Sequence, residues 1–538
     1  MSRSTQSSDA RTYARRWKTL AVLSLSLLII GLDNTILNVA LPSLQKEFDA
    51  STSTLQWIVD SYLLVFAGLL LTAGTLGDRF GRKLALQVGL VLFGGGSLAV
   101  LAVDSAGQLI AVRSVMGLGG ALIMPATLSI ISNVFPREER AKAIGIWSGM
   151  ASIGIGLGPF AGGLLLEYFD WSSVFLLNVP VAMAALVLGF ALVPESRDPR
   201  PGRFDLPGAG LSVAALTALV YGVIEAPERG WTDPRILGCL TAALLLGAAF
   251  VRWELRTKEP MLNLDFFRKP RFSVASGAMS VAFFSLFGAS FAMTQFLQDV
   301  QGYSALEAGA AQMPLALGLI AGAGSSVKLA GRFGTTRVVT GGLVLLGLLL
   351  GSAVFWYAGM PYLPIGLWFA ALALALGWIA GPATDAVMGA VPEEKAGVAS
   401  AMNDVTRQVG GALGTAVIGS LITSLFTSNV ESGASAGDAF TDALGIGFVI
   451  AGAVAVIAAV AVRRWLPARH AETVEDSAHQ LGRSLPGTRG AAVLRARAGA
   501  DAHGAGAERG TAAAVRLGQG LGHDLGRAPG AARPARAG

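Results

Sequence analysis

The apolar part of this sequence lacks the side chains on which most catalytic and metal sites depend. All four histidines lie in the segment 466–538, and the single cysteine is Cys239. No imidazole is therefore available before that segment for metal binding, general-base catalysis or proton relay, and no internal disulfide can form. None of the eight lysines follows a glycine, so the phosphate-binding pattern G-x-x-x-x-G-K-[ST] cannot occur. The sequence excludes nucleotide hydrolysis by that route, gives poor support to an integral hydrolase or metalloprotease, and indicates no enzyme and no cofactor.

Charge is also scarce. Only 14% of the 538 residues are charged and 53% are hydrophobic, whereas a typical soluble domain has about 25% charged residues. Fourteen apolar runs between residues 19 and 462 reach the length of about 20 residues that a bilayer-spanning helix needs. Because the runs are continuous and rich in Leu, Ala and Gly, helices are favoured over strands. The sequence predicts an all-α integral membrane protein with fourteen transmembrane helices.

The few cations are distributed unevenly. If the N-terminus is cytoplasmic, 26 of the 41 Lys and Arg residues lie in inner segments before residue 466, and the outer loops hold only Lys46, Arg229 and Arg235. Since cytoplasmic loops are enriched in Lys and Arg, we expect a multi-pass protein of the cell membrane with both termini cytoplasmic. The net charge of +6 is then a consequence of topology, and no nucleic-acid partner is expected.

The chain divides into segments of different character. We predict five parts: a cytoplasmic N-terminus at 1–18, a six-helix bundle at 19–193, two inserted helices at 205–253, a second six-helix bundle at 273–465, and a tail at 466–538. The tail is rich in Ala, Gly and Arg without a sustained apolar period, so we expect it to be disordered. The stretch "LGDRFGRK" at 76–83 is echoed by "LAGRFGTTR" at 329–337, which indicates a duplicated transporter.

Ionisable residues interrupt the apolar runs at three places in the first half. Asp33 lies in "LLIIGLDNTILNVALP", Asp60 in "WIVDSYLL" and Arg113 in "LIAVRSVMGLGG". Such residues are expensive inside a membrane and usually functional, so we expect proton coupling or substrate binding at these positions. Arg113 has two interpretations: it snorkels outward, or it faces the interior and pairs with a carboxylate.

The loop "GTLGDRFGRK" at 74–83 contains Gly74, Asp78, Arg79, Gly81 and Arg82. Glycines suit a tight turn between two helices, and the cations suit the inner membrane face. Asp78 is the exception, because an acid opposes the positive charge expected at the inner face. It predicts a latch in which Asp78 binds an arginine or the N-terminal end of a helix in the facing bundle. The alternative is an ordinary basic turn with one compensating acid.

The stretch "GIGLGPFAGG" at 154–163 places Gly154, Gly158 and Gly162 on one helix face, with Pro159 and Gly163 beside them. Small residues at this spacing let two membrane helices approach closely, and a proline can kink the helix there. The stretch also matches the dinucleotide pattern G-x-G-x-x-A, but no strand precedes it, so that match fails its context. Generic packing without a switching role is the alternative.

The second half has a looser polar cluster and an aromatic stripe. Asp385, Asn403, Asp404 and Arg407 form the cluster. Asp404 and Arg407 stand three residues apart and can pair on one helix face, which makes a structural role as plausible as a transport role. The stripe, interpreted either as a wall for a planar ligand or as lipid-facing and packing residues, contains Phe283, Phe284, Phe287, Phe291 and Met293.

These motifs together resemble the major facilitator superfamily, in particular its fourteen-helix drug:proton antiporter branch. The opening "LDNTILNVALP", the 74–83 loop, Arg113 with Gly117, and "GIGLGPFAGG" carry the resemblance, which covers about residues 18–465. It implies export of an antibiotic of the aromatic polyketide class, driven by the proton motive force. From the position of the two acids inside apolar runs, we expect Asp33 and Asp60 to exchange protons during transport.

Other functions remain open at this point. A multidrug exporter of broader range, a cation-coupled importer, and a membrane sensor or scaffold that uses its tail for docking are the alternatives. By the resemblance, the glycine and proline motif at 154–163 favours export over import. We expect the protein to be a monomer with a small-molecule drug, protons and the lipid bilayer as its partners.

Overall fold

The computed structural model describes residues 3–197, 205–257, 260, 262, 264–391 and 396–466. The chain up to Leu466 forms one compact unit. The disorder predicted for the tail concerns residues that, apart from Leu466, lie outside the described part.

The described chain is helical, and it contains the predicted fourteen helices that are long and apolar enough to cross a membrane. The fold class is therefore confirmed. In chain order the α-helices are α1 Arg3–Phe48, α2 Thr52–Phe80, α3 Arg82–Ala99, α4 Ala106–Val134, α5 Arg137–Tyr168, α6 Ser173–Leu176, α7 Asn178–Leu192, α8 Leu206–Arg229, α9 Pro234–Glu254, α10 Pro270–Gln295, α11 Ala305–Ala311, α12 Met313–Phe333, α13 Thr335–Gly351, α14 Tyr362–Gly389, α15 Ala396–Glu431 and α16 Ala436–Trp465.

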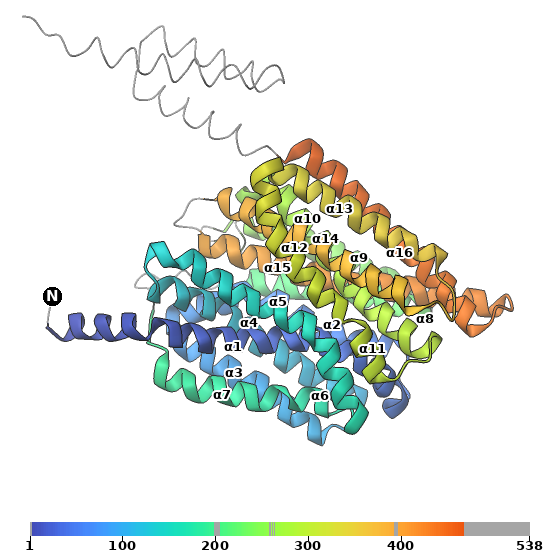
Figure 1. The fold of residues 1–538 in the computed structure, drawn as a ribbon, viewed down its shortest axis with the longest axis horizontal. Helices are drawn as coiled ribbons and strands as arrows, with labels where there is room; N and C mark the ends of the chain where they lie inside the picture. The colour runs from blue at the N-terminus through green and yellow to red at the C-terminus, as the bar shows by residue number, and fades with distance from the viewer. Residues whose placement is uncertain are drawn as a thin grey trace, which may run out of the picture. The chain divides into compact units, whose positions relative to one another are not determined.

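The helices pack in the same pattern twice. In the first half α1 packs on α5, α2 on α4, and α3 on α7; in the second half α10 packs on α15, α12 on α14, and α13 on α16 (Figure 1). The echoed loops also match in backbone geometry, because Gly81 and Gly334 both have positive φ, 123° and 85°. Glycine adopts this region without a steric penalty. The duplication indicated by the two short loops is thus present in both packing and turns.

Two predicted spans are interrupted in the structure. The run 172–193 forms α6 and α7 with a break at Leu177, and the run 306–328 forms α11 and α12 with a break at Gln312. Pro180 and Pro314 follow these breaks, and each lacks the N–H that a continuous helix would use. Apolar length predicted each span, but it contains no information about such local breaks.

The inserted helices connect the two halves. α8 packs on α9 and also contacts α2 of the first half and α15 of the second. On α2, Trp57 donates its indole N–H to Glu225 of α8 (3.1 Å). On α15, the Ser420 hydroxyl donates to the Val223 carbonyl of α8 (2.8 Å). These contacts make α8 a bridge between the halves.

Candidate functional site

A buried ion pair joins α1 and α4 in the first half. Nη1 of Arg113 lies 2.5 Å from Oδ2 of Asp33, and each residue is only 1% exposed. The other carboxylate oxygen, Oδ1, accepts a hydrogen bond from the amide of Asn178 on α7 (3.1 Å). Both oxygens of Asp33 are therefore satisfied, which is the condition under which a buried charge is tolerated.

Arg113 is held on all sides within the first half. Its Nε donates to the Ile58 carbonyl of α2 (3.2 Å), and its guanidinium carbon lies 4.4 Å from the centre of the Tyr62 ring. A cation over an aromatic face gains further stabilisation when it is desolvated. Of the two interpretations considered for Arg113, outward snorkelling is wrong, and pairing with a carboxylate is the arrangement found.

Asp60 lies outside this ion pair. It is 0% exposed, and neither of its carboxylate oxygens has a hydrogen-bond partner in the described part of the chain. Ile58 and Tyr62, which contact Arg113, share one face of α2 because they are four residues apart. Asp60 is two residues from each, and a step of two residues turns a helix by about 200°. The carboxylate therefore lies on the opposite face of α2.

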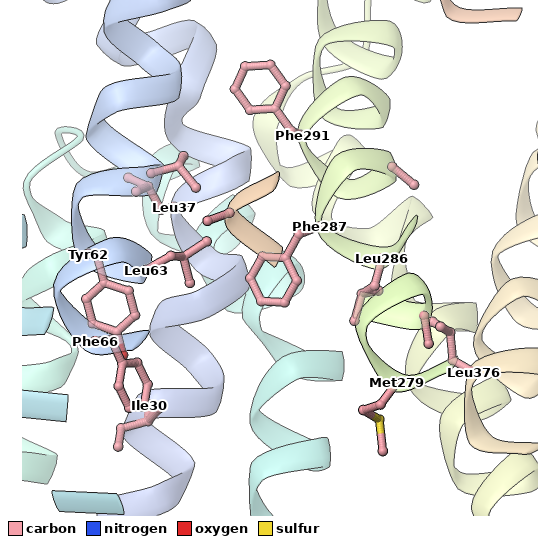
Figure 2. Close-up of a cluster of buried hydrophobic side chains, with 14 of the residues drawn as sticks. Ile30, Leu37, Tyr62, Leu63, Phe66, Met279, Leu286, Phe287, Phe291 and Leu376 are labelled. Atoms are coloured by element: carbon pink, nitrogen blue, oxygen red, sulfur yellow. The ribbon is translucent and has the colours of Figure 1, made fainter. Parts of the chain in front are cut away.

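That opposite face points toward the second half. Gln56, one turn before Asp60, donates its amide to the Thr415 carbonyl of α15 (3.1 Å). Leu63, three residues after Asp60, faces Phe287 of α10 across the boundary between the halves (Figure 2). Asp60 is thus an unpaired buried carboxylate on the surface where the halves meet, whereas Asp33 is enclosed within one half.

The glycines of the 154–163 stretch lie against α1. A Cβ added at Gly154 would stand 2.7 Å from the Leu28 carbonyl oxygen, one at Gly158 3.0 Å from the Ile36 nitrogen, and one at Gly162 2.9 Å from the Ile36 carbonyl oxygen. Real Cβ atoms rarely or never approach backbone this closely, so the glycines allow the contact, as the spacing predicts.

The adjoining face of α5 lies against the second half. A Cβ added at Gly163 of α5 would stand 3.0 Å from the carbonyl carbon of Ala305 on α11. In the other direction, a Cβ added at Gly309 of α11 would stand 3.0 Å from the carbonyl carbon of Pro159 on α5. These contacts lie at the end of the bundle where the chain turns into α11, here called the Gly302 end. The hydrogen bonds from Gln56 to α15 are a second set of contacts that joins the halves. The motif helix therefore contacts both α1 and the opposite half.

The 74–83 loop lies at the other end of the bundle, here called the Gly81 end. Asp78 pairs with Arg82 of the same loop (2.8 Å), and the Arg82 backbone N–H donates to the Ser196 carbonyl after α7 (3.0 Å). Arg79 lies on the last turn of α2, and Gly74 lies against Pro125 of α4. The predicted latch partner in the second bundle is not the partner of Asp78 in this structure, and the latch stays a prediction.

We predict that Asp78→Asn will reduce transport while leaving stability nearly unchanged. The pair that it breaks is a half-buried i,i+4 pair, and i,i+4 pairs contribute only about 0.3–0.5 kcal/mol. Thermal unfolding and drug efflux measured on the same preparation separate the two effects. Equal efflux by the variant and the wild type would show that Asp78 does not act as a latch and that the 74–83 loop is an ordinary basic turn.

The second-half cluster is partly assembled. Arg407 pairs with Asp404 on α15 (3.2 Å), which confirms the pairing predicted from their spacing. Asn403 donates to the Thr384 hydroxyl on α14 (3.3 Å), whereas Asp385 on α14 is exposed. The Arg407 guanidinium carbon lies 5.0 Å from the centre of the Phe283 ring. The cluster therefore holds α14 and α15 together and extends toward the aromatic stripe.

The aromatic stripe of α10 is mostly buried. The rings of Phe283 and Phe287 are stacked with centroids 6.2 Å apart. Phe287, Phe291 and Met293 are at most 3% exposed, and Phe284 is half-buried. Phe287 and Phe291 both lie on the side of α10 that faces α1 and α2 (Figure 2). Phe287 and Phe291 therefore pack between the halves.

Three contributors were not singled out from the sequence. Asn178 completes the contacts of Asp33, Tyr62 covers Arg113, and Gln56 joins α2 to α15. The available signal was the same for Asn178 and Gln56: an amide side chain in or beside an apolar run. Such a side chain needs a partner when it is buried.

Comparisons with known proteins agree with this architecture. A family model described as the Major Facilitator Superfamily matches residues 23–415. The chain is 39% identical over 413 residues to the tetracenomycin C resistance and export protein of Streptomyces glaucescens, covering 75% of this chain and 76% of that protein. It is 38% identical over 415 residues to the multidrug efflux pump LfrA of Mycolicibacterium smegmatis, covering 77% and 82%.

A solved structure supports the fold alone. It is that of a bacterial homolog of the human lysosomal transporter Spinster, described as inward-facing and unoccupied. It superposes with a TM-score of 0.58 at 19% identity and covers 84% of this chain and 98% of that one. Together with the fourteen apolar helices, the family match gives a multi-pass membrane transporter rather than an enzyme, and this chain belongs to the Major Facilitator Superfamily.

Proposed function

We propose that this protein is a proton-coupled antiporter that exports an antibiotic across the cytoplasmic membrane. The observation that carries the proposal is the unequal state of two buried carboxylates: Asp33 is paired with Arg113, and Asp60 is unpaired where the halves meet. The relatives named for drug efflux and antibiotic export support the direction of transport. The protein would act as a monomer with cytoplasmic termini and no cofactor.

In the proposed mechanism, a transport cavity opens and closes between the two halves, and Asp60 carries a proton when this cavity is closed. A buried carboxylate without a partner is tolerated in its neutral form. Opening of the cavity to water or arrival of a cationic or polar drug would favour the charged form and release the proton. Asp33 would exchange its proton in the other phase, when movement of α1 against α4 separates it from Arg113.

The energy available from protons suffices for substantial export. One proton entering down about 100 mV gains roughly 2.3 kcal/mol, and each pH unit adds about 1.4 kcal/mol. Their sum of about 3.7 kcal/mol supports a drug gradient of several hundred-fold, since each factor of ten costs about 1.4 kcal/mol.

The substrate proposed first is tetracenomycin C or a similar aromatic polyketide. A broader multidrug exporter is the second candidate, because the identity to the multidrug pump LfrA is 38% and that to the tetracenomycin protein is 39%. The two similarities are too close to separate these substrates.

Uptake by inverted vesicles tests the proposal. Vesicles with the reconstituted protein should accumulate tetracenomycin C under an imposed pH gradient, and a protonophore should abolish the uptake. Asp33→Asn should be inactive, because a neutral side chain cannot exchange a proton. Uptake that ignores both the gradient and the Asn change would contradict proton coupling. Coupled flux of another drug without tetracenomycin flux would retain the mechanism and select the second candidate.

A further inference from the structure

An apolar cavity of about 870 Å³ lies beside the inserted helices. We call it the inserted-helix cavity; its walls come from α2, α8, α9 and α15, so both halves contribute. Its polar lining residues are Ser212, Arg252 and Arg256, and all the others are apolar residues or glycine. The volume lies within the range of about 300–1,000 Å³ that is typical of small-molecule sites.

The two arginines lie together at one end of this cavity. Arg252 and Arg256 are four residues apart at the end of α9, both are exposed, and neither has an ion-pair partner in the described part of the chain. The nearest acid in sequence, Glu254, is only 3% exposed and accepts a hydrogen bond from the Leu262 backbone N–H (3.0 Å). Its charge is therefore directed into the protein, and no acid in the part of the chain that the structure describes pairs with the two cations at the cavity.

The apolar wall extends away from the arginines along α9. Ala243 also lines the cavity, and the helix from Ala243 to Glu254, where α9 ends, is roughly 17 Å long. That length is comparable to one leaflet of the hydrocarbon core, about 15 Å. Leu244 and Leu255, which line the same wall, are 76% and 57% exposed, so the wall is accessible from outside the protein.

This combination matches one class of ligand. A long apolar wall accepts an acyl chain, and two exposed guanidinium groups at its end can bind a phosphate, because Arg binds phosphate through paired hydrogen bonds. Basic pockets between membrane helices on the cytoplasmic side bind anionic lipid headgroups. We propose that the inserted-helix cavity binds an anionic phospholipid, with an acyl chain along α9 and the phosphate on Arg252 and Arg256.

Lipid binding to the detergent-solubilised full-length protein tests the proposal independently of transport. Native mass spectrometry would compare dioleoyl phosphatidylglycerol with dioleoyl phosphatidylcholine. The variant Arg252→Gln/Arg256→Gln should bind phosphatidylglycerol roughly 30-fold more weakly, about the effect of two membrane-surface cations. The matched control is Arg463→Gln/Arg464→Gln, which removes two exposed arginines from the end of α16 and should bind as the wild type does.

A second variant fills the cavity without touching the arginines. Gly247 lines it, and a Cβ added there meets no atom within 4 Å. Gly247→Leu should therefore fold normally, as its thermal unfolding would show, and should lose the bound phosphatidylglycerol. Wild-type binding by both variants would overturn the proposal. Equal binding of phosphatidylcholine, or displacement of the lipid by inorganic phosphate, would also overturn it, because the site would then not select an anionic lipid.

Discussion

Replacing Arg113 by methionine should lower the free energy of unfolding by about 3–5 kcal/mol, the usual cost of breaking a buried ion pair by removing one partner. The reason is the environment of Asp33. The carboxylate is 1% exposed and retains only the Asn178 amide once the guanidinium is gone. The variant also lacks the contacts of the Arg113 side chain with the Ile58 carbonyl and the Tyr62 ring. Their loss adds to the destabilisation.

A double-mutant cycle separates the charge from the packing. In Asp33→Asn/Arg113→Met the buried charge is absent. The asparagine introduced by the first substitution needs no ion-pair partner, and its amide oxygen can still accept from Asn178. Much of the lost stability should return, because neutral replacements of a buried pair are often tolerated. Unfolding in mixed detergent would measure all four proteins. Equal losses in the single and double variants would show that packing, and not the ion pair, accounts for the effect.

The second large effect is expected at the contact of α5 with α1. Gly158→Ala should destabilise the protein by about 1–3 kcal/mol, the usual cost of overpacking, and should strongly reduce transport. The added Cβ would collide with the Thr35 hydroxyl and would stand 3.0 Å from both the Ile36 nitrogen and the Leu32 carbonyl oxygen. Backbone atoms in a packed helix cannot move aside as a flexible side chain can.

Gly149→Ala is the matched control on the same helix. A Cβ at Gly149 meets no atom within 4 Å, so alanine there should be neutral or stabilising by about 0.5–1 kcal/mol through its helix preference. Thermal unfolding and efflux would be measured for both variants. If Gly158→Ala behaves as Gly149→Ala does, close approach of α5 to α1 is unnecessary for the fold and for transport.

Features that depend on local sequence were predictable. The fourteen helices follow from apolar length, and the Asp404–Arg407 pair follows from a spacing of three on one helix. The matching glycine turns at 81 and 334 were visible because each lies in a short repeated stretch. Each of these properties is decided within a few turns of a single helix or loop.

Features that join distant helices were not predictable with the same certainty. Asp33 and Arg113 are 80 residues apart, and the sequence left the orientation of Arg113 open because both interpretations suit an arginine near a helix end. The contact of Asn178 with Asp33 depends on how α7 rotates against α1, which one sequence does not specify. The latch predicted for Asp78 likewise concerned a partner in the other half, and the pair found is local.

Proton release on drug binding tests the proposed coupling most directly. The purified protein in weakly buffered solution would be mixed with tetracenomycin C, or with whichever drug the vesicles accumulate, while a pH-sensitive dye reports the protons released. We predict release by the wild type and none by Asp60→Asn, whose drug affinity is measured separately to confirm that binding persists. Undiminished release by Asp60→Asn would contradict the role proposed for Asp60, and drug binding without release by the wild type would contradict proton-coupled export.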